Sequence, residues 1–397
     1  MNRLFLLLNL AFVFGVTHSH AQPFTKKYIM SFHSCDVNQC NGPQDHTVQL
    51  AESDDGSNWT LVPNFPSYGG SVPDVIIRNN KLYIYTPGEV TRYDYNTNTW
   101  DSSPASVSIK DSAANQVNFV DPSAIVDSSG NLVLIFMNST GLTGDPAQCA
   151  TYPCTKYFDS AIEVSGSDGT QFTKQSGHRY SITLTSGTAS DPDVYFDGSK
   201  YILYISKGTS TYAYYASSLH GSYQVFPNLS NGLLTNNGGI PCGYYDAITQ
   251  KYWTYVHASS GNSTEIKQKI HSDFNSSLSG LTTVISGTST GLGSGYKTES
   301  PGFTENTFSA TTSMYDVSAV TQAYFHYQTQ EKVVNAYHLE KVDKIEIYNL
   351  LGVLLRVEKV NASLTLSFNI NPLTNGVYML CFVDKKGLRS SSKLLKW

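Results

Sequence analysis

The sequence predicts an all-β chain that folds as a five-bladed β-propeller followed by a small C-terminal β-sandwich domain. The main observation is a proline that recurs five times at the start of a short apolar run, at positions 73, 122, 192, 241 and 301. These prolines are 49, 70, 49 and 60 residues apart, which is typical of a four-stranded propeller blade with its loops. The composition agrees, because 40% of the residues are hydrophobic, only 14% are charged, and no long helical periodicity is present.

A second β-rich, aromatic run follows four of the prolines after a short polar turn, at residues 81–85, 132–136, 201–205 and 252–256. This order predicts the same antiparallel hairpin in each blade. Two Asp-Gly turns, in residues 51–59 and 166–172, are expected between the third and fourth strands of their blades.

The N-terminus is interpreted as a signal peptide over residues 1–21. Arg3 precedes an apolar run over residues 4–16, and Ser19 and Ala21 are small residues at the −3 and −1 positions of a cleavage site. We therefore expect an exported protein with a propeller over 22–330 and a C-terminal domain over 331–397. The net charge of −5, with no basic cluster in the central region, argues against a nucleic-acid partner. No later apolar stretch is long enough to span a membrane, and we expect a monomer.

Six cysteines fall into two spaced pairs and two single residues. Cys35 and Cys40, and likewise Cys149 and Cys154, are separated by four residues and follow a predicted strand. In an oxidising compartment each pair is expected to form a disulfide that pins a loop. A single zinc site made of all four thiolates is the alternative, and it requires two distant loops to meet. Cys242 and Cys381 are expected to be free or buried thiols.

The last sixty residues resemble the C-terminal sorting domain of the type IX secretion system of Bacteroidetes, over about residues 335–397. The motifs that carry this resemblance are Ile347-Tyr348-Asn349 before Gly352, the run from Asn375 to Tyr378, and a terminal Lys-Leu strand. The Asn-Pro usually found at the start of such domains is absent. The resemblance implies the type IX secretion machinery as a partner and a secreted or cell-surface location. An ordinary accessory β-sandwich is the alternative.

Three acids precede prolines at what is expected to be one face of the propeller. These predicted catalytic residues are Asp121, Asp191 and Glu299. The start of the first strand and the end of the second lie on the same face of a blade. Polar residues at the ends of the second strands are therefore predicted to bind substrate at the same mouth: His33, Asn138, Lys207 and His257. Such a group of carboxylates has the parts needed for glycoside hydrolysis.

Residues 25–330 resemble the propeller glycosidases of glycoside hydrolase family 43, because Asp121 and Asp191 stand in Asp-Pro motifs and Glu299 in a Glu-x-Pro motif. The resemblance implies an inverting mechanism without a metal or other cofactor, acting on a plant or algal polysaccharide. An inverting pair of carboxyl groups is roughly 6.5–9.5 Å apart. The order of the acids departs from the family, since the aspartates lie on neighbouring blades and Ile240 precedes the next proline. This difference in order disappears if the first blade takes its inner strand from the residues around Glu299. The role of each acid is left open.

Alternatives remain for the site and for the function. An Asp before Pro is also a common turn signal, and Asp74 and Asp193, which follow their prolines, are expected to point away from Asp121. A non-catalytic glycan-binding or adhesion propeller is the main rival. A lyase or phosphorylase is another, whereas a sialidase would need an arginine cluster that Arg78, Arg92 and Arg179 do not provide. A structural calcium or sodium ion in the channel is a further alternative.

Overall fold

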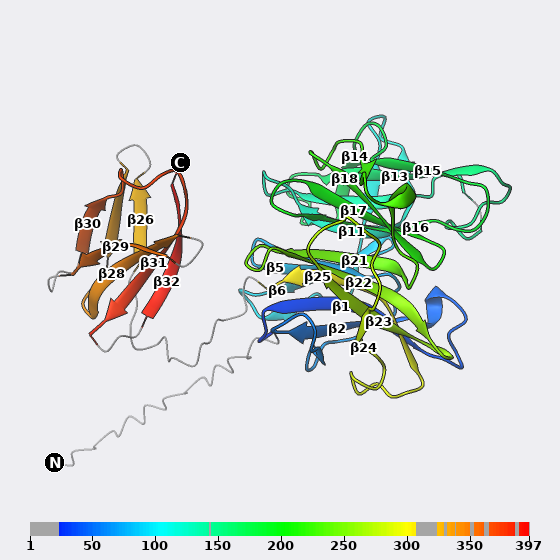
Figure 1. Ribbon diagram of the computed structural model, residues 1–397, viewed down its shortest axis with the longest axis horizontal. Helices are drawn as coiled ribbons and strands as arrows, with labels where there is room; N and C mark the ends of the chain where they lie inside the picture. Colours follow the sequence, from blue (N-terminus) through cyan, green and yellow to red (C-terminus); the bar gives the residue numbers. More distant parts are fainter. Residues whose placement is uncertain are drawn as a thin grey trace, which may run out of the picture. The chain divides into compact units, whose positions relative to one another are not determined.

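The computed structural model describes residues 24–142, 144–306, 324–328, 332–337, 339–349, 353–360, 365–385 and 389–396. The chain divides into two compact units, residues 1–309 and 310–397 (Figure 1). The predicted signal peptide lies outside the described residues. The predicted limits of 22–330 and 331–397 remain predictions, since the division between the compact units falls earlier in the chain. No helix in the described part of the chain has the length and hydropathy needed to cross a membrane.

The described residues of the first unit form five sheets, here called blades I to V, with no α-helix. Blade I contains β25 (Tyr296–Glu305), β1 (Tyr28–Asp36), β2 (Thr47–Ser53) and β3 (Thr60–Leu61). Blade II contains β4 (Asp74–Arg78), β5 (Lys81–Thr86), β6 (Glu89–Asp94), β7 (Thr99–Trp100) and β8 (Ala105–Ser106). A short 3-10 helix, η1 (Pro43–Asp45), precedes β2.

Blade III contains β11 (Phe119–Val126), β12 (Leu132–Asn138), β13 (Cys154–Glu163), β14 (Gln171–Lys174), β15 (Tyr180–Leu184), β9 (Ser108–Lys110) and β10 (Gln116–Val117). Blade IV contains β16 (Ser190–Phe196), β17 (Tyr201–Lys207), β18 (Ser210–Ala216), β19 (Gln224–Val225) and β20 (Leu233–Thr235), with η2 (Ser230–Gly232) before β20. Blade V contains β21 (Gly239–Asp246), β22 (Lys251–Ser260), β23 (Ser263–His271) and β24 (Thr282–Ile285). The prediction of an all-β propeller is confirmed.

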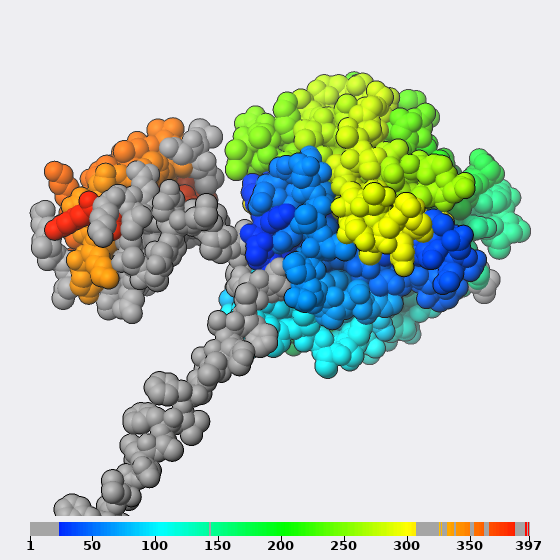
Figure 2. Space-filling view, turned by 90° about the horizontal axis from the view of Figure 1, so that it is seen from below, coloured from blue at the N-terminus to red at the C-terminus, as the bar shows by residue number. Residues whose placement is uncertain are grey.

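Blade I joins the two ends of the propeller. Its inner strand β25 pairs antiparallel with β1 (Figure 1). In this pairing His33 lies opposite Glu299. In the space-filling view, blue residues from the start of the propeller lie beside yellow residues from its end (Figure 2). The inner strands β4, β11, β16, β21 and β25 contact one another in a closed ring. The solution in which blade I takes its inner strand from the residues around Glu299 is therefore confirmed.

Each interface between neighbouring blades has its own apolar core. Between blades V and I, for example, Trp253 and Tyr255 pack with Tyr28, Phe32 and Trp59. Comparable clusters fill the other four interfaces. Aromatic side chains bury a large area and pack edge to face, which explains why this chain has 27 tyrosines.

The residue before each repeated proline has a left-handed backbone conformation. Their φ angles run from 42° to 57°, and the residues are Val72, Asp121, Asp191, Ile240 and Ser300. The ladder register shifts at this point in blades I, III, IV and V. A bulge of this kind re-aims side chains at the edge of a sheet. All five residues and their prolines line one central cavity of about 30 Å³.

The second unit is a β-sandwich, as predicted. One sheet contains β26 (Tyr324–Gln328), β27 (Val333–Tyr337) and β30 (Thr365–Asn369). The other contains β29 (Leu354–Lys359), β28 (Val342–Asn349), β31 (Gly376–Asp384) and β32 (Arg389–Lys396). Val334 and Phe368 of the first sheet share one core with Ile345 and Leu380 of the second.

Candidate active site

Glu299 lies on β25 and is held by two hydrogen-bond donors. Its side chain is only 13% exposed. Nε2 of His33 lies 3.2 Å from its Oε2, and the Thr264 hydroxyl donates to its Oε1 at 2.6 Å. Burial alone would raise the pKa of Glu299, but these hydrogen bonds and the nearby His257 outweigh it and lower the pKa to about 2. Glu299 is therefore a stable carboxylate at neutral pH.

The contacts of His33 fix its tautomer. Its Nδ1 accepts a hydrogen bond of 3.2 Å from the backbone N–H of Val72, so the ring proton is on Nε2 and is donated to Glu299. The ring stacks on His46, with centroids 3.9 Å apart and planes inclined by 11°. His46 in turn contacts the Ser71 hydroxyl through Nδ1 at 2.8 Å. Burial and the neighbouring His33 lower the pKa of His46 to about 4, which keeps this ring neutral.

The ligand atoms of His33, His46 and Glu299 lie within 4.8 Å of one another, as in a metal site. The stacked rings argue against that use. A nitrogen lone pair lies in the plane of its imidazole ring, so two nearly parallel rings 3.9 Å apart do not direct their lone pairs at one ion. The N–H of Val72 also occupies the free lone pair of His33. In this cluster the His33 ring serves as a hydrogen-bond donor to Glu299.

Asp121 and Asp191 occupy matching bulges on blades III and IV. Burial raises the pKa of Asp191, and the charges of Asp145 and Glu299 add to this effect. A 2.5 Å hydrogen bond from the Ser190 hydroxyl offsets part of the rise, and the pKa lies at about 6. Burial and the charge of Asp191 raise the pKa of Asp121 well above its usual range. The pKa values of Asp121 and Asp191 are thus raised, whereas the pKa of Glu299 is lowered.

Asp74 and Asp193, which follow their prolines, link one blade to the next. Oδ2 of Asp74 accepts from the backbone N–H of Ala124 at 2.6 Å, and Oδ2 of Asp193 accepts from that of Gly243 at 2.8 Å. Both carboxyl groups are buried. Burial raises the pKa of Asp74 to about 7 and that of Asp193 well above its usual range. Both acids have a structural role in the ring of inner strands.

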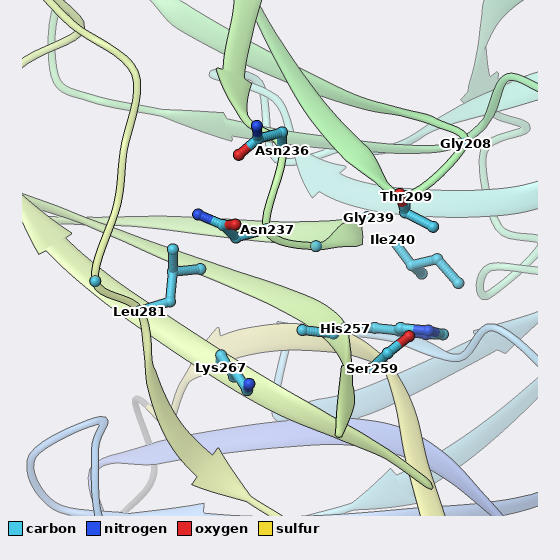
Figure 3. A pocket seen from close by; sticks show the side chains of 13 residues that line it. Gly208, Thr209, Asn236, Asn237, Gly239, Ile240, His257, Ser259, Lys267 and Leu281 are labelled. Atoms are coloured by element: carbon cyan, nitrogen blue, oxygen red, sulfur yellow. The ribbon is translucent and has the colours of Figure 1, made fainter. Parts of the chain in front are cut away.

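A larger cavity of about 610 Å³ is lined by residues of blades IV and V (Figure 3). His257, at the end of β22, lines it together with Ile240, which also lines the small central cavity. Burial lowers the pKa of His257, although the charge of Glu299 opposes this shift. His257 therefore lines the larger cavity and is close enough to Glu299 for the two charges to interact.

The other two predicted substrate-binding residues are engaged elsewhere. The Asn138 amide donates to Asp159 at 2.8 Å, and its oxygen accepts from the backbone N–H of Thr140 at 2.9 Å. The Lys207 ammonium lies 5.6 Å from the centre of the Tyr212 ring. Neither residue lines either of the two cavities. Their role in substrate binding remains a prediction.

Both predicted disulfides are present, Cys35–Cys40 and Cys149–Cys154. The first brings Sγ of Cys40 to 3.7 Å from Nε2 of His46. The second lies in the connection between β12 and β13, which also carries Asp145, whose charge contributes to the raised pKa of Asp191. Each disulfide thus lies in a connection that also carries a residue interacting with a candidate group. Cys242 is a buried free thiol.

Sequence reasoning missed His46 and Thr264. One signal was available for His46: it stands directly before β2, six residues after Cys40, and β2 pairs with the strand that holds His33. Thr264 lies on the outer strand β23, and nothing in its sequence context marks it as a partner of Glu299.

Comparisons with known proteins give one family match and several structural similarities. Residues 328–396 match the family model described as a secretion system C-terminal sorting domain. This match confirms the predicted resemblance of the tail and indicates export to the cell surface or beyond. A search of curated proteins found no match to this chain.

The similar solved structures include glycoside hydrolases of family 43, at low identity and with partial coverage. An endo-arabinase from Bacteroides thetaiotaomicron is 14% identical, covers 63% of this chain and 92% of its own, and gives a TM-score of 0.42. A family 43 α-L-arabinofuranosidase from Clostridium thermocellum is 14% identical, with 62% and 85% covered and a TM-score of 0.38. A family 43 enzyme from Xanthomonas citri, complexed with xylotriose, is 16% identical, with 63% and 89% covered and a TM-score of 0.38.

Proposed function

We propose that this protein is an exported glycoside hydrolase that cleaves a plant or algal polysaccharide with inversion at the anomeric carbon. The observation that carries the proposal is the opposite shift in the pKa values of two acids whose charges interact. Glu299 has a pKa of about 2 and Asp191 a pKa of about 6. Pairs of titratable groups whose environments push their pKa values apart are typical of a catalytic base and a catalytic acid.

In the proposed mechanism Glu299 is the general base. Its carboxylate accepts a proton from a water molecule that attacks the anomeric carbon, while His33 and Thr264 orient the carboxylate. Asp191, in its protonated form, gives its proton to the leaving glycosidic oxygen as the bond to carbon breaks. Glu299 takes up one proton and Asp191 releases one, and this proposed step requires no metal or cofactor.

In this proposal Asp121 positions Asp191 and affects its pKa, and it takes no part in the proton transfer. Its Oδ2 accepts the backbone N–H of Asp191 at 3.2 Å, which fixes the position of the second acid. This assignment follows the arrangement in which Glu299 belongs to blade I and the two aspartates belong to neighbouring blades.

A non-catalytic glycan-binding propeller is the second candidate, and the size of the central cavity favours it. That cavity is only about 30 Å³, whereas the cavity beside His257 is about 610 Å³. Ligand pockets commonly have about 300–1,000 Å³. A glycan could therefore bind in the larger cavity without its glycosidic bond reaching the acids.

Hydrolysis of a polysaccharide panel separates the two candidates. Arabinan, xylan, galactan and algal polysaccharides are incubated with the full exported chain and with Glu299→Gln, and released reducing sugar is measured. Release that the variant lowers at least a hundredfold supports the hydrolase. Binding to one glycan without release by either protein would overturn the hydrolase in favour of the binding protein. NMR that identifies which anomer of the product is released first tests whether the configuration at the anomeric carbon is inverted.

A further inference from the structure

We infer that the 610 Å³ cavity beside His257 binds a negatively charged sugar unit, one that carries a carboxylate or a sulfate group, and that Lys267 recognises this charge. The inference rests on the proposed function only in taking a glycan as the ligand. It names the chemical class of that glycan and a residue that selects it.

The cavity is placed to hold a sugar unit next to the reacting one. Its walls come from the end of β22 with His257 and Ser259, the loop before β21 with Asn236 and Asn237, and Lys267 on β23 (Figure 3). His257 is also close enough to Glu299 for each charge to shift the pKa of the other. His257 therefore connects this cavity electrostatically to the candidate base.

The electrostatics of the cavity favour an anion. No Asp or Glu is among its lining residues. Among the described residues, the ammonium of Lys267 forms no ion pair with a carboxylate. Glu265, two positions earlier on the same strand, already accepts a hydrogen bond of 2.7 Å from the Thr283 hydroxyl. An ammonium group in a concave site, with no anionic partner of its own, attracts a negatively charged ligand.

Two further groups add to this preference. Nδ1 of His257 is buried without a hydrogen-bond partner among the described residues, and a buried polar atom of this kind is stabilised when a ligand supplies the partner. Lys297 on β25 adds positive charge nearby, since its charge contributes to the lowered pKa of His257. The neutral part of a sugar also finds partners, because amides and a hydroxyl suit its hydroxyl groups and Ile240 and Leu281 offer an apolar surface.

The test measures glycan binding with catalysis switched off. Glu299→Gln in the full chain serves as the background, so that an active enzyme does not degrade its ligand. Binding is measured by calorimetry to polygalacturonate and alginate as uronates, to carrageenan as a sulfate ester, and to arabinan and dextran as neutral glycans. Lys267→Met keeps the length of the side chain and removes the charge. Lys251→Met is the matched control, because Lys251 lies at the other end of β22 and bonds to Ser272 at 2.7 Å.

We expect at least one anionic glycan to bind, with an affinity that falls at least tenfold in Lys267→Met, stays unchanged in Lys251→Met and weakens as salt is added. The member of the panel that binds shows whether carboxylate or sulfate is the source of the charge. Equal binding by Lys267→Met, or binding to neutral glycans alone, would overturn the inference.

The outcome for this site is independent of the outcome for hydrolysis. Lys267-dependent binding of an anionic glycan by a chain that hydrolyses nothing would support the inference and reject the hydrolase. Hydrolysis of a neutral glycan that is insensitive to Lys267→Met would support the hydrolase and reject the inference.

Discussion

The backbone N–H of Asp191 donates a hydrogen bond of 3.2 Å to Oδ2 of Asp121. The two aspartates are thus joined directly, although 70 residues separate them and they belong to different blades. Burial raises both pKa values; the charge of Asp191 adds to the rise at Asp121, and the charges of Asp145 and Glu299 add to the rise at Asp191. The two aspartates therefore hold protons more strongly than Glu299, which is ionised. Four predictions follow from this contrast and from the buried acids around it.

Replacement of Glu299 by Gln should lower kcat at least a hundredfold while the protein stays folded. The amide keeps the shape of the side chain and can still accept from the Thr264 hydroxyl, but it cannot accept a proton from water. Glu305→Gln is the control, since Glu305 lies at the end of the same strand and its carboxylate accepts a hydrogen bond of 3.3 Å from the Tyr244 hydroxyl, away from Glu299. Equal losses in both variants, or a large loss of melting temperature in Glu299→Gln alone, would show that Glu299 is structural.

Replacement of His33 by Leu should move the acidic limb of the pH–rate profile upwards. Without the Nε2–H donor, the burial of Glu299 is less well opposed, so its pKa should rise from about 2 towards or above the ordinary value of about 4.3. The measurement is kcat/KM between pH 3 and 8. His178→Leu is the control, because His178 also contacts a carboxylate, that of Asp159 at 2.5 Å, outside this site. An unshifted acidic limb would mean that His33 does not control Glu299.

Activity should decline as the pH rises through about 6, because Asp191 must be protonated to act as the acid. Asp191→Asn should lower kcat at least a hundredfold and abolish this basic limb in the remaining activity. A substrate with a good leaving group, such as an aryl glycoside, should restore part of the rate, since it needs less protonation. If the variant keeps the wild-type basic limb, another group is the acid.

The buried acids should destabilise the folded protein increasingly as the pH rises from about 4 to 7. Asp74 has a pKa of about 7, and burial raises the pKa of Asp193 and Asp121 well above the usual range. In this window the folded protein holds protons that the unfolded chain, with pKa values of about 3.9, releases. The stability that each acid contributes is fully present below the unfolded pKa and is lost progressively as the pH rises to the folded pKa.

Asp74→Asn tests the assignment of this pH dependence. The amide oxygen can still accept the N–H of Ala124 but carries no titrating proton, so the loss of melting temperature that Asp74 causes between pH 4 and 7 should be absent from the variant. The histidines with lowered pKa values act in the opposite direction up to about pH 6.5, but they do so equally in both proteins, so the difference between the two proteins reports on Asp74. A difference in melting temperature between wild type and variant that is constant from pH 4 to 7 would contradict the prediction.

Much of the fold could be predicted because prolines recur at the start of every inner strand. The meeting of His33 with Glu299 was also within reach, since both were placed at one face by the antiparallel order of the strands. The left-handed conformation of Asp121 and its equivalents could not be predicted, because a residue before proline normally prefers an extended backbone. These residues lie on inner strands that contact one another in a closed ring, and this tertiary packing is absent from the local sequence.

The larger cavity was beyond sequence reasoning for a different reason. Asn236 and Asn237 lie on a loop, and Lys267 lies on an outer strand. Their convergence depends on the path of loops between blades IV and V, for which the sequence contains no repeat. Asn138 and Lys207 satisfy the strand-end rule, yet their side chains contact their own blades.

The pairing of β25 with β1 determines when the candidate site can form. Glu299 and its partner His33 come from opposite ends of the propeller, so the hydrogen bond between them forms only after every intervening blade has been made and arranged in order. Contacts between such distant parts of a chain form slowly. A nascent, truncated or still unfolded chain therefore has no assembled candidate site. The proposed hydrolysis would begin only after the exported chain has folded.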